Sequence, residues 1–240
     1  GTTPPNSYFS NVNIVNTNKA FLSGGQGTLL TSSDGGNTWF LINSNSTGNL
    51  ERIIFKDLLN GLIIANSGPS IITMDGGDNW NPINYSFGWL NDGAFYGNNS
   101  IALAGSDGKI YISKDGGQTW VEKTVASSGT YVSSISFKDS LNGIAVGETG
   151  LLLYTTDGGD SWNQQFSPTL TDFSDIEYSE NNCGIIIGKD GVILGTKKGI
   201  QIVGVESEQT NPLPITLYLA QNYPNPFNPS TKISWRSPAG

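Results

Sequence analysis

Carboxylates are the main residues with which this chain could do chemistry. The 240-residue sequence contains 20 Asp and Glu, 12 Lys and Arg, one cysteine and no histidine. The lack of histidine excludes Ser–His and Cys–His nucleophilic machinery and any histidine-ligated metal site. General acid–base catalysis by a carboxylate pair and calcium binding remain open. The positions of the aspartates in the sequence bear on both.

Four aspartates recur in one motif, which reads [Ser/Thr]-x-Asp-Gly-Gly-x-[Thr/Asn/Ser]-Trp. Successive copies are separated by 41, 40 and 42 residues, and residues 196–199 resemble a decayed fifth copy. The motif aspartates are Asp34, Asp75, Asp115 and Asp157, and the motif tryptophans are Trp39, Trp80, Trp120 and Trp162. A glycine lies seven residues before each aspartate, so two landmarks keep the same register.

Each repeat predicts four short strands separated by glycine-rich turns. The first strands are expected at 13–15, 52–55, 93–96, 134–137 and 175–178. Four strands in about 41 residues are typical of one β-propeller blade. The sequence therefore predicts an all-β propeller over residues 1–205, with almost no helix. It has about five four-stranded blades, which either close a ring or form part of a larger propeller.

The Asp-Gly-Gly segment predicts a tight hairpin turn. The glycines are expected at positive φ, with the aspartate accepting backbone N–H groups and the preceding hydroxyl tying the same turn. The tryptophan is expected to begin the outer strand and fill the wedge between blades. Because every repeat carries the same residues, a structural role is favoured over catalysis or calcium binding. No metal site and no cofactor are predicted.

These motifs resemble the Asp-box (BNR) repeats of sialidases, sortilin-type receptors and photosystem II stability factors. A sialidase would need three arginines around the substrate carboxylate, but this chain has only Arg52 and Arg236, so that activity is rejected. The photosystem-factor resemblance implies an assembly role through a basic patch. No such patch is evident in a chain of net charge −8. An assembly factor for an envelope complex remains an alternative.

A polysaccharide-degrading hydrolase is the other alternative, because xyloglucan-cleaving propellers use two aspartates across a cleft. The carboxyl groups of inverting enzymes lie about 6.5–9.5 Å apart. No spacing in this sequence singles out such a pair, so a non-enzyme is favoured. The candidates outside the boxes are Asp57, Asp92, Asp107, Asp139, Glu148, Asp172, Asp175 and Asp190.

The connections between blades suggest where a ligand would bind. Tyr85, Phe87 and Trp89 fall within five residues of one connection and could stack on a sugar or a peptide. The alternative, which we favour, is that they plug the core between blades. Turn residues Asp107, Glu148 and Asp190 would add a negative rim to the same face. The lone Cys183, in an apolar run, is expected to be buried.

The composition changes after about residue 205. Residues 206–217 are expected to form a linker, and residues 218–240 the beginning of another domain. Its string QNYPNPFNPSTKI closely resembles the opening of the C-terminal sorting domain of the type IX secretion system of Bacteroidetes. Only the first part of such a domain is present, so a longer protein is expected. The residues that carry this resemblance most clearly are Gln221, Asn222, Tyr223, Pro224, Asn225, Pro226, Phe227, Asn228 and Pro229.

The acidic composition, with a pI of about 4.4, argues against nucleic acid as a partner, because phosphate backbones are bound by Lys and Arg. Taken together, the sequence predicts an extracellular or cell-surface module that binds or builds structure without catalysis. The predicted partners are the type IX secretion machinery and a glycan or surface protein, and self-association is also considered.

Overall fold

The computed structural model describes residues 8–178, 183–197 and 201–202. These residues form five four-stranded antiparallel sheets, each with its strands in sequence order. The first two sheets comprise β1 (Phe9–Ile14), β2 (Ala20–Gly24), β3 (Leu29–Ser32) and β4 (Phe40–Leu41), then β5 (Leu50–Phe55), β6 (Gly61–Ala65), β7 (Ile71–Thr73) and β8 (Asn81–Pro82). The third comprises β9 (Leu90–Tyr96), β10 (Ser100–Gly105), β11 (Lys109–Ser113) and β12 (Val121–Thr124).

The last two sheets follow the same plan. They comprise β13 (Val132–Phe137), β14 (Gly143–Gly147), β15 (Leu152–Thr155) and β16 (Asn163–Gln164), then β17 (Phe173–Tyr178), β18 (Gly184–Gly188), β19 (Ile193–Lys197) and β20 (Gln201–Ile202). Three short 3-10 turns are the helical elements of the described part. The predicted all-β architecture of five four-stranded blades is confirmed.

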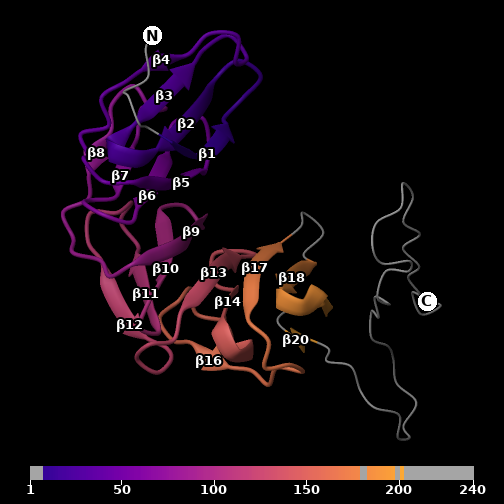
Figure 1. Ribbon diagram of the computed structural model, residues 1–240. Helices are drawn as coiled ribbons and strands as arrows, with labels where there is room; N and C mark the ends of the chain where they lie inside the picture. The colour runs from indigo at the N-terminus through magenta and orange to yellow at the C-terminus, as the bar shows by residue number, and fades with distance from the viewer. Residues whose placement is uncertain (1–7, 179–182, 198–200, 203–240) are drawn as a thin grey trace, which may run out of the picture.

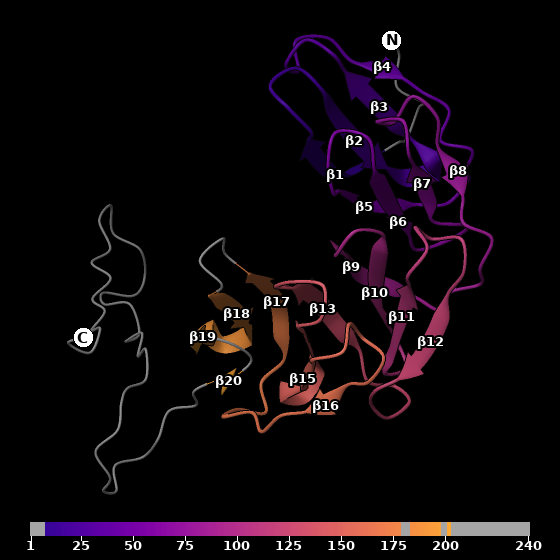
Figure 2. The same ribbon diagram turned by 180° about the vertical axis from the view of Figure 1, so that it is seen from behind.

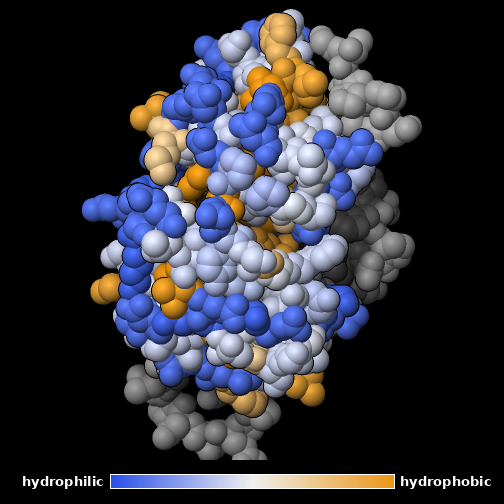
Figure 3. Space-filling view, turned by 90° about the vertical axis from the view of Figure 1, so that its left-hand side faces the viewer, coloured by the Kyte–Doolittle hydropathy of each residue, from blue (hydrophilic) through white to orange (hydrophobic). Residues whose placement is uncertain are grey.

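The five sheets are arranged as the blades of a propeller (Figure 1). The first strand of each blade contacts the first strand of the next, in the order β1, β5, β9, β13 and β17. Figures 1 and 2 show that the blades follow an arc that is open between the first and the fifth. The side seen in Figure 3 is mostly hydrophilic, with hydrophobic residues in separate small patches.

The core lies between neighbouring blades, where aromatic rings fill the wedge. Phe21 of the first blade stacks on Phe55 of the second with ring centroids 5.3 Å apart. Trp80 closes the same cluster edge-on, 5.8 Å from Phe21, and is only 1% exposed. Tyr96, Phe137 and Trp162 repeat the arrangement between the third and fourth blades. The predicted wedge-filling role of the motif tryptophan is confirmed at these positions.

Two local predictions were wrong. The outer strands begin one residue after each motif tryptophan, because the indole belongs to the box turn, where Trp120 Nε1 donates to the Gly117 carbonyl (3.1 Å). Cys183 is exposed rather than buried, because it lies before the first residue of β18 and so outside the fifth sheet. The predicted linker and sorting segment lie outside the described residues. Within the described residues, no helix has the length and apolar character to cross a membrane.

Candidate functional site

The motif aspartates organise their own turns. Oδ1 of Asp115 accepts the Thr119 backbone N–H (2.9 Å), and Oδ2 accepts the Thr119 hydroxyl (2.5 Å). The Ser113 hydroxyl donates to Asp115 (2.8 Å) and accepts the Gly117 N–H (2.8 Å), as predicted. Gly116 and Gly117 both have positive φ. The other three boxes repeat this pattern through Asp34, Asp75 and Asp157.

The electrostatics of the boxes suit acceptors rather than general acids. In three boxes, hydrogen bonds from the residue four positions after the aspartate lower the pKa of that aspartate to about 2. These aspartates are Asp75, Asp115 and Asp157. The same kind of hydrogen bond, led by the Thr38 hydroxyl, lowers the pKa of Asp34. An ionised carboxylate whose oxygens are held by its own turn cannot supply a proton near neutral pH. The box aspartates have a structural role.

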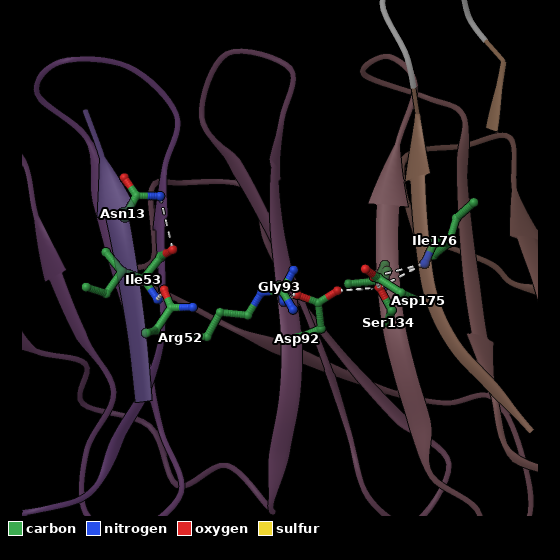
Figure 4. A network of polar contacts seen from close by, with 10 residues as sticks. Asn13, Arg52, Ile53, Asp92, Gly93, Ser134, Asp175 and Ile176 are labelled. Atoms are coloured by element: carbon green, nitrogen blue, oxygen red, sulfur yellow. Dashed lines mark hydrogen bonds and ion pairs between the residues drawn. The ribbon is translucent and has the colours of Figure 1, made fainter. Parts of the chain in front are cut away.

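A second set of polar residues joins one blade to the next (Figure 4). The set has five members, one on the first strand of each blade. Each member is paired with the next-to-last residue of the second strand of its own blade, so all five share one register position. We call them the inner-strand row. They are Asn11, Arg52, Asp92, Ser134 and Asp175.

Asp92 is the centre of the inner-strand row. Its Oδ1 accepts Arg52 Nε at 2.9 Å and the Gly93 N–H at 2.7 Å. Its Oδ2 accepts the Ser134 hydroxyl at 2.5 Å and the Ile135 N–H at 3.1 Å. The side chain is 2% exposed, and burial raises the pKa of Asp92 although Arg52 opposes this change. Every lone pair is thereby engaged, as a buried carboxylate requires.

The row continues on both sides of Asp92. The Ser134 hydroxyl oxygen also lies 2.7 Å from Asp175 Oδ1 and accepts the Ile176 N–H (3.3 Å). At the other end, Asn11 accepts the Ile53 N–H at 3.1 Å. The row therefore links all five blades.

A concave cavity of about 400 Å³ lies beside the row and is the most relevant place for the hydrolase alternative. Asp92 and Glu177 both line it, and burial, then Asp175 and Asp92, raise the pKa of Glu177. A hydrolase of this type needs two carboxylates available to substrate and water. Asp92 is already bonded on both oxygens, so Glu177 has no available carboxylate partner in this pair.

The predicted aromatic platform lines an open groove of about 680 Å³, formed by the second blade and the connection that leads to the third. Phe87 packs inward, with its ring centroid 5.0 Å from Trp120 and 5.1 Å from Tyr111. Tyr85 lies 4.8 Å from Phe87 and is also half-buried. Trp89 is 55% exposed. The groove therefore combines two anchored rings with one indole that is open to solvent.

The predicted acidic residues do not gather around this groove. Asp107 accepts the Gly129 N–H (3.0 Å), and Glu148 accepts the Tyr131 N–H (3.2 Å), so both tie a turn to the connection between the third and fourth blades. Asp190 sits at positive φ in the corresponding turn of the fifth blade. Glu148 lines a separate hollow of about 320 Å³. Of the six predicted binding residues, the three aromatic ones thus line one groove, whereas the three acidic ones are not among the residues that line it.

The inner-strand row and Glu177 were missed as a site by sequence reasoning, although Asp92 and Asp175 were among the candidate carboxylates. The signal was present: the row recurs at steps of 41, 40, 42 and 41 residues, in the same period as the boxes. This periodicity was not recognised from the sequence, because the residue type at the row position changes from blade to blade. Among the described residues, no group of three or more His, Cys, Asp or Glu side chains is placed to hold a metal ion.

Comparison with known proteins supports a propeller of BNR repeats. Residues 77–153 match the family model described as "Photosynthesis system II assembly factor YCF48". The chain is 27% identical over 143 residues to the photosystem II stability/assembly factor HCF136 of Arabidopsis thaliana. That alignment covers 55% of this chain and 34% of HCF136, so the chain spans about a third of this relative.

Two solved structures share the fold. A YCF48 chain bound to D1 peptide aligns with a TM-score of 0.60 and 20% identity, covering 81% of this chain and 66% of that one. An ancestral GH74 enzyme aligns with a TM-score of 0.63 and 15% identity, covering 81% of this chain and 31% of the enzyme. At these identities the likeness concerns the fold, and both assembly factors and an enzyme use it.

Proposed function

We propose that this chain is a non-catalytic binding module that works outside the cell or on its surface, where it recognises a surface protein or glycan. The observation that carries the proposal is the 680 Å³ groove, in which Trp89 is exposed beside the anchored rings of Tyr85 and Phe87. An exposed indole on a rigid aromatic base supplies contact area at low entropic cost.

The binding test uses glycan and peptide arrays probed with the whole chain, with Trp89→Ala as the test variant. Phe166→Ala is the matched control, because Phe166 is 86% exposed and is not among the groove residues. Loss of array binding in Trp89→Ala but not in Phe166→Ala would support the groove. Unchanged binding in Trp89→Ala would reject it. Peptides are included because a solved structure of the same fold is described as YCF48 bound to D1 peptide.

Export by the type IX secretion system is the second part of the proposal. It rests on the segment that begins at Gln221 and resembles the start of a sorting domain. In a host with this system, we expect the native protein in the medium or on the surface, and a variant lacking residues 218–240 inside the envelope. Equal export of both proteins would reject this route.

The assembly-factor alternative is favoured by the similarity to YCF48 and HCF136. It predicts that the chain captures one subunit of an envelope complex rather than a family of glycans. Affinity capture with the wild-type chain and Trp89→Ala would separate the two, since a single subunit lost with Trp89→Ala would identify an assembly client. The hydrolase alternative predicts sugar release that Glu177→Gln abolishes.

A further inference from the structure

The cavity of about 400 Å³ beside the inner-strand row contains charged groups that the row does not use fully. It is lined by residues from the first strand of every blade, from Asn13 of β1 to Glu177 of β17. Arg52 from the second blade and Glu177 from the fifth bring opposite charges into this one space. None of its described lining residues belongs to the groove that contains Trp89, so the cavity is a separate place for a ligand.

Arg52 is a cation with hydrogen-bond donors to spare. Its side chain extends from β5 toward Asp92 on β9, where Nε lies 2.9 Å from Oδ1 (Figure 4). The side chain is 42% exposed, and no described residue accepts a hydrogen bond from its two terminal amino groups. Lys56, the other cation of the lining, donates to the Asn98 carbonyl instead. Because a guanidinium offers a planar fork of N–H groups that matches a carboxylate, Arg52 is held in place by Asp92 and can still bind an acid.

Glu177 is a carboxylate without a cation of its own. It follows Asp175 by two residues on β17, and no described residue forms an ion pair or hydrogen bond with its side chain. At the same register position, the second, third and fourth blades carry Ile54, Ala94 and Ser136. Burial, then Asp175 and Asp92, raise the pKa of Glu177, and Arg52 opposes this change. Arg52 therefore acts on Glu177 through space without neutralising it, and a positively charged ligand group would stabilise its ionised form.

The same cavity also has an aromatic wall. Phe55, Phe95 and Phe137 line it, and each of the three is half-buried. Phe55 stacks on Phe21 with ring centroids 5.3 Å apart, and Phe137 stacks on Tyr96 at 3.7 Å. These contacts hold two of the rings in place from behind. Ligand sites with a fixed apolar wall and a few polar groups take ligands that have the same two parts.

We propose that this cavity binds a free amino acid with an apolar side chain, whose carboxylate pairs with the Arg52 guanidinium and whose ammonium pairs with Glu177. An anion without an ammonium would leave Glu177 uncompensated, and a cation without a carboxylate would leave the terminal amino groups of Arg52 without an acceptor. A zwitterion meets both requirements and leaves the net charge of the cavity unchanged. The volume suits a small ligand, because pockets for small molecules span about 300–1,000 Å³.

Isothermal titration calorimetry with the whole chain tests the ligand class. Leucine and phenylalanine should bind more tightly than glycine, because their side chains cover the aromatic wall. N-acetyl-leucine lacks the ammonium and leucine methyl ester lacks the carboxylate. Each should bind about tenfold more weakly than leucine, because each loses one charge-assisted contact. The proposal is overturned if neither leucine nor phenylalanine binds, or if either analogue binds as tightly as leucine.

Glu177→Gln tests the site. It should weaken leucine binding about tenfold and leave N-acetyl-leucine binding unchanged, because the acetylated ligand has no ammonium for this carboxylate. Retained binding of N-acetyl-leucine would also show that the variant is folded. Glu122→Gln is the matched control, because Glu122 lies on the outer strand β12 and is not among the cavity residues. It should change neither affinity.

Equal leucine affinity in wild type and Glu177→Gln would place the ligand elsewhere and overturn the proposal. Trp89→Ala should bind leucine as the wild-type chain does, since Trp89 lines the other groove. Loss of leucine binding in Trp89→Ala would also overturn the proposal and assign the amino acid to that groove. The two sites are thereby tested independently.

Discussion

The box turns and the inner-strand row both use aspartate, but in opposite environments. The box residue Asp115 lies near the surface, and hydrogen bonds within its own turn lower its pKa to about 2. Asp92 of the row is buried, its pKa is raised by that burial, and its partners come from the blades on both sides. The boxes therefore shape individual blades, whereas the row joins blades. The same side chain acts locally in one region and across the fold in the other.

Removal of the Asp92 carboxylate should have the largest effect. Asp92→Ala would leave the Ile135 N–H and the Arg52 guanidinium without their acceptor inside the row, and the Ser134 hydroxyl with Asp175 as its remaining acceptor. Arg52 is 42% exposed and can bind water instead, but each buried donor left without an acceptor costs about 1–3 kcal/mol. We expect a loss of that order in the free energy of unfolding, measured by urea denaturation.

Two variants sharpen this result. Asp92→Asn keeps an acceptor and should cost less than Asp92→Ala. Glu122→Ala removes an exposed ion pair with Lys109 (2.9 Å) and should cost at most about 1 kcal/mol. If Asp92→Ala cost no more than Glu122→Ala, the row would not join the blades.

Loss of one box carboxylate should have a smaller, local effect. Asp115→Ala removes the acceptor of the Gln118 and Thr119 N–H groups, which lie at the surface and can bind water instead. We expect a loss of about 1–2 kcal/mol in the free energy of unfolding. Hydrogen exchange should speed up in the third blade and stay unchanged in the first. Faster exchange throughout the arc would contradict a local role.

The repeat explains why most of this framework could be predicted from the sequence. The boxes recur with the same residues, so their period, their positive-φ glycines and the four strands per blade follow from one motif. The row could not be recognised in the same way, because the link from each blade to the next is made by different residue types, namely Asn, Arg, Asp, Ser and Asp. It depends on which side chain the neighbouring blade presents, which only the assembled sheets reveal.

The candidate site was predictable only in part. That Tyr85 and Phe87 fill the core and Trp89 faces solvent depends on the packing of Tyr111 and Trp120 from the next blade. The alternation of aromatics at 85, 87 and 89 is compatible with either outcome. In the same way, Asp107 and Glu148 were expected to form a charged rim, but their acceptor roles depend on where the connection between the third and fourth blades passes.

The pH dependence should separate the two kinds of aspartate. A carboxyl whose folded pKa is about 2, below its ordinary value of 3.8, adds stability that is complete above about pH 4. That stability is lost as the pH falls toward 2. The pKa of Asp92 is raised, so its effect on stability has the opposite sign. Its contribution to the free energy of unfolding falls as the pH rises through its folded pKa.

Urea midpoints measured from pH 7 down to about pH 2 test this difference. We expect the wild-type chain to lose stability below about pH 4, and Asp115→Asn to lose less over that interval because one of the shifted groups is gone. Asp92→Asn should not reduce the acid loss. An acid loss that is identical in wild type and Asp115→Asn would show that the box carboxylates do not control it.

The smallest effect is expected where two boxes touch. Lys114 of the third box forms an ion pair with Asp160 of the fourth at 2.5 Å, with side chains 51% and 58% exposed. Exposed pairs of this kind contribute about 0–1 kcal/mol and weaken as salt screens them. Lys114→Ala should therefore lower the free energy of unfolding by no more than that, and by less at high salt. A loss comparable to that of Asp92→Ala would mean that the boxes also hold neighbouring blades together, and the contrast between the two regions would fail.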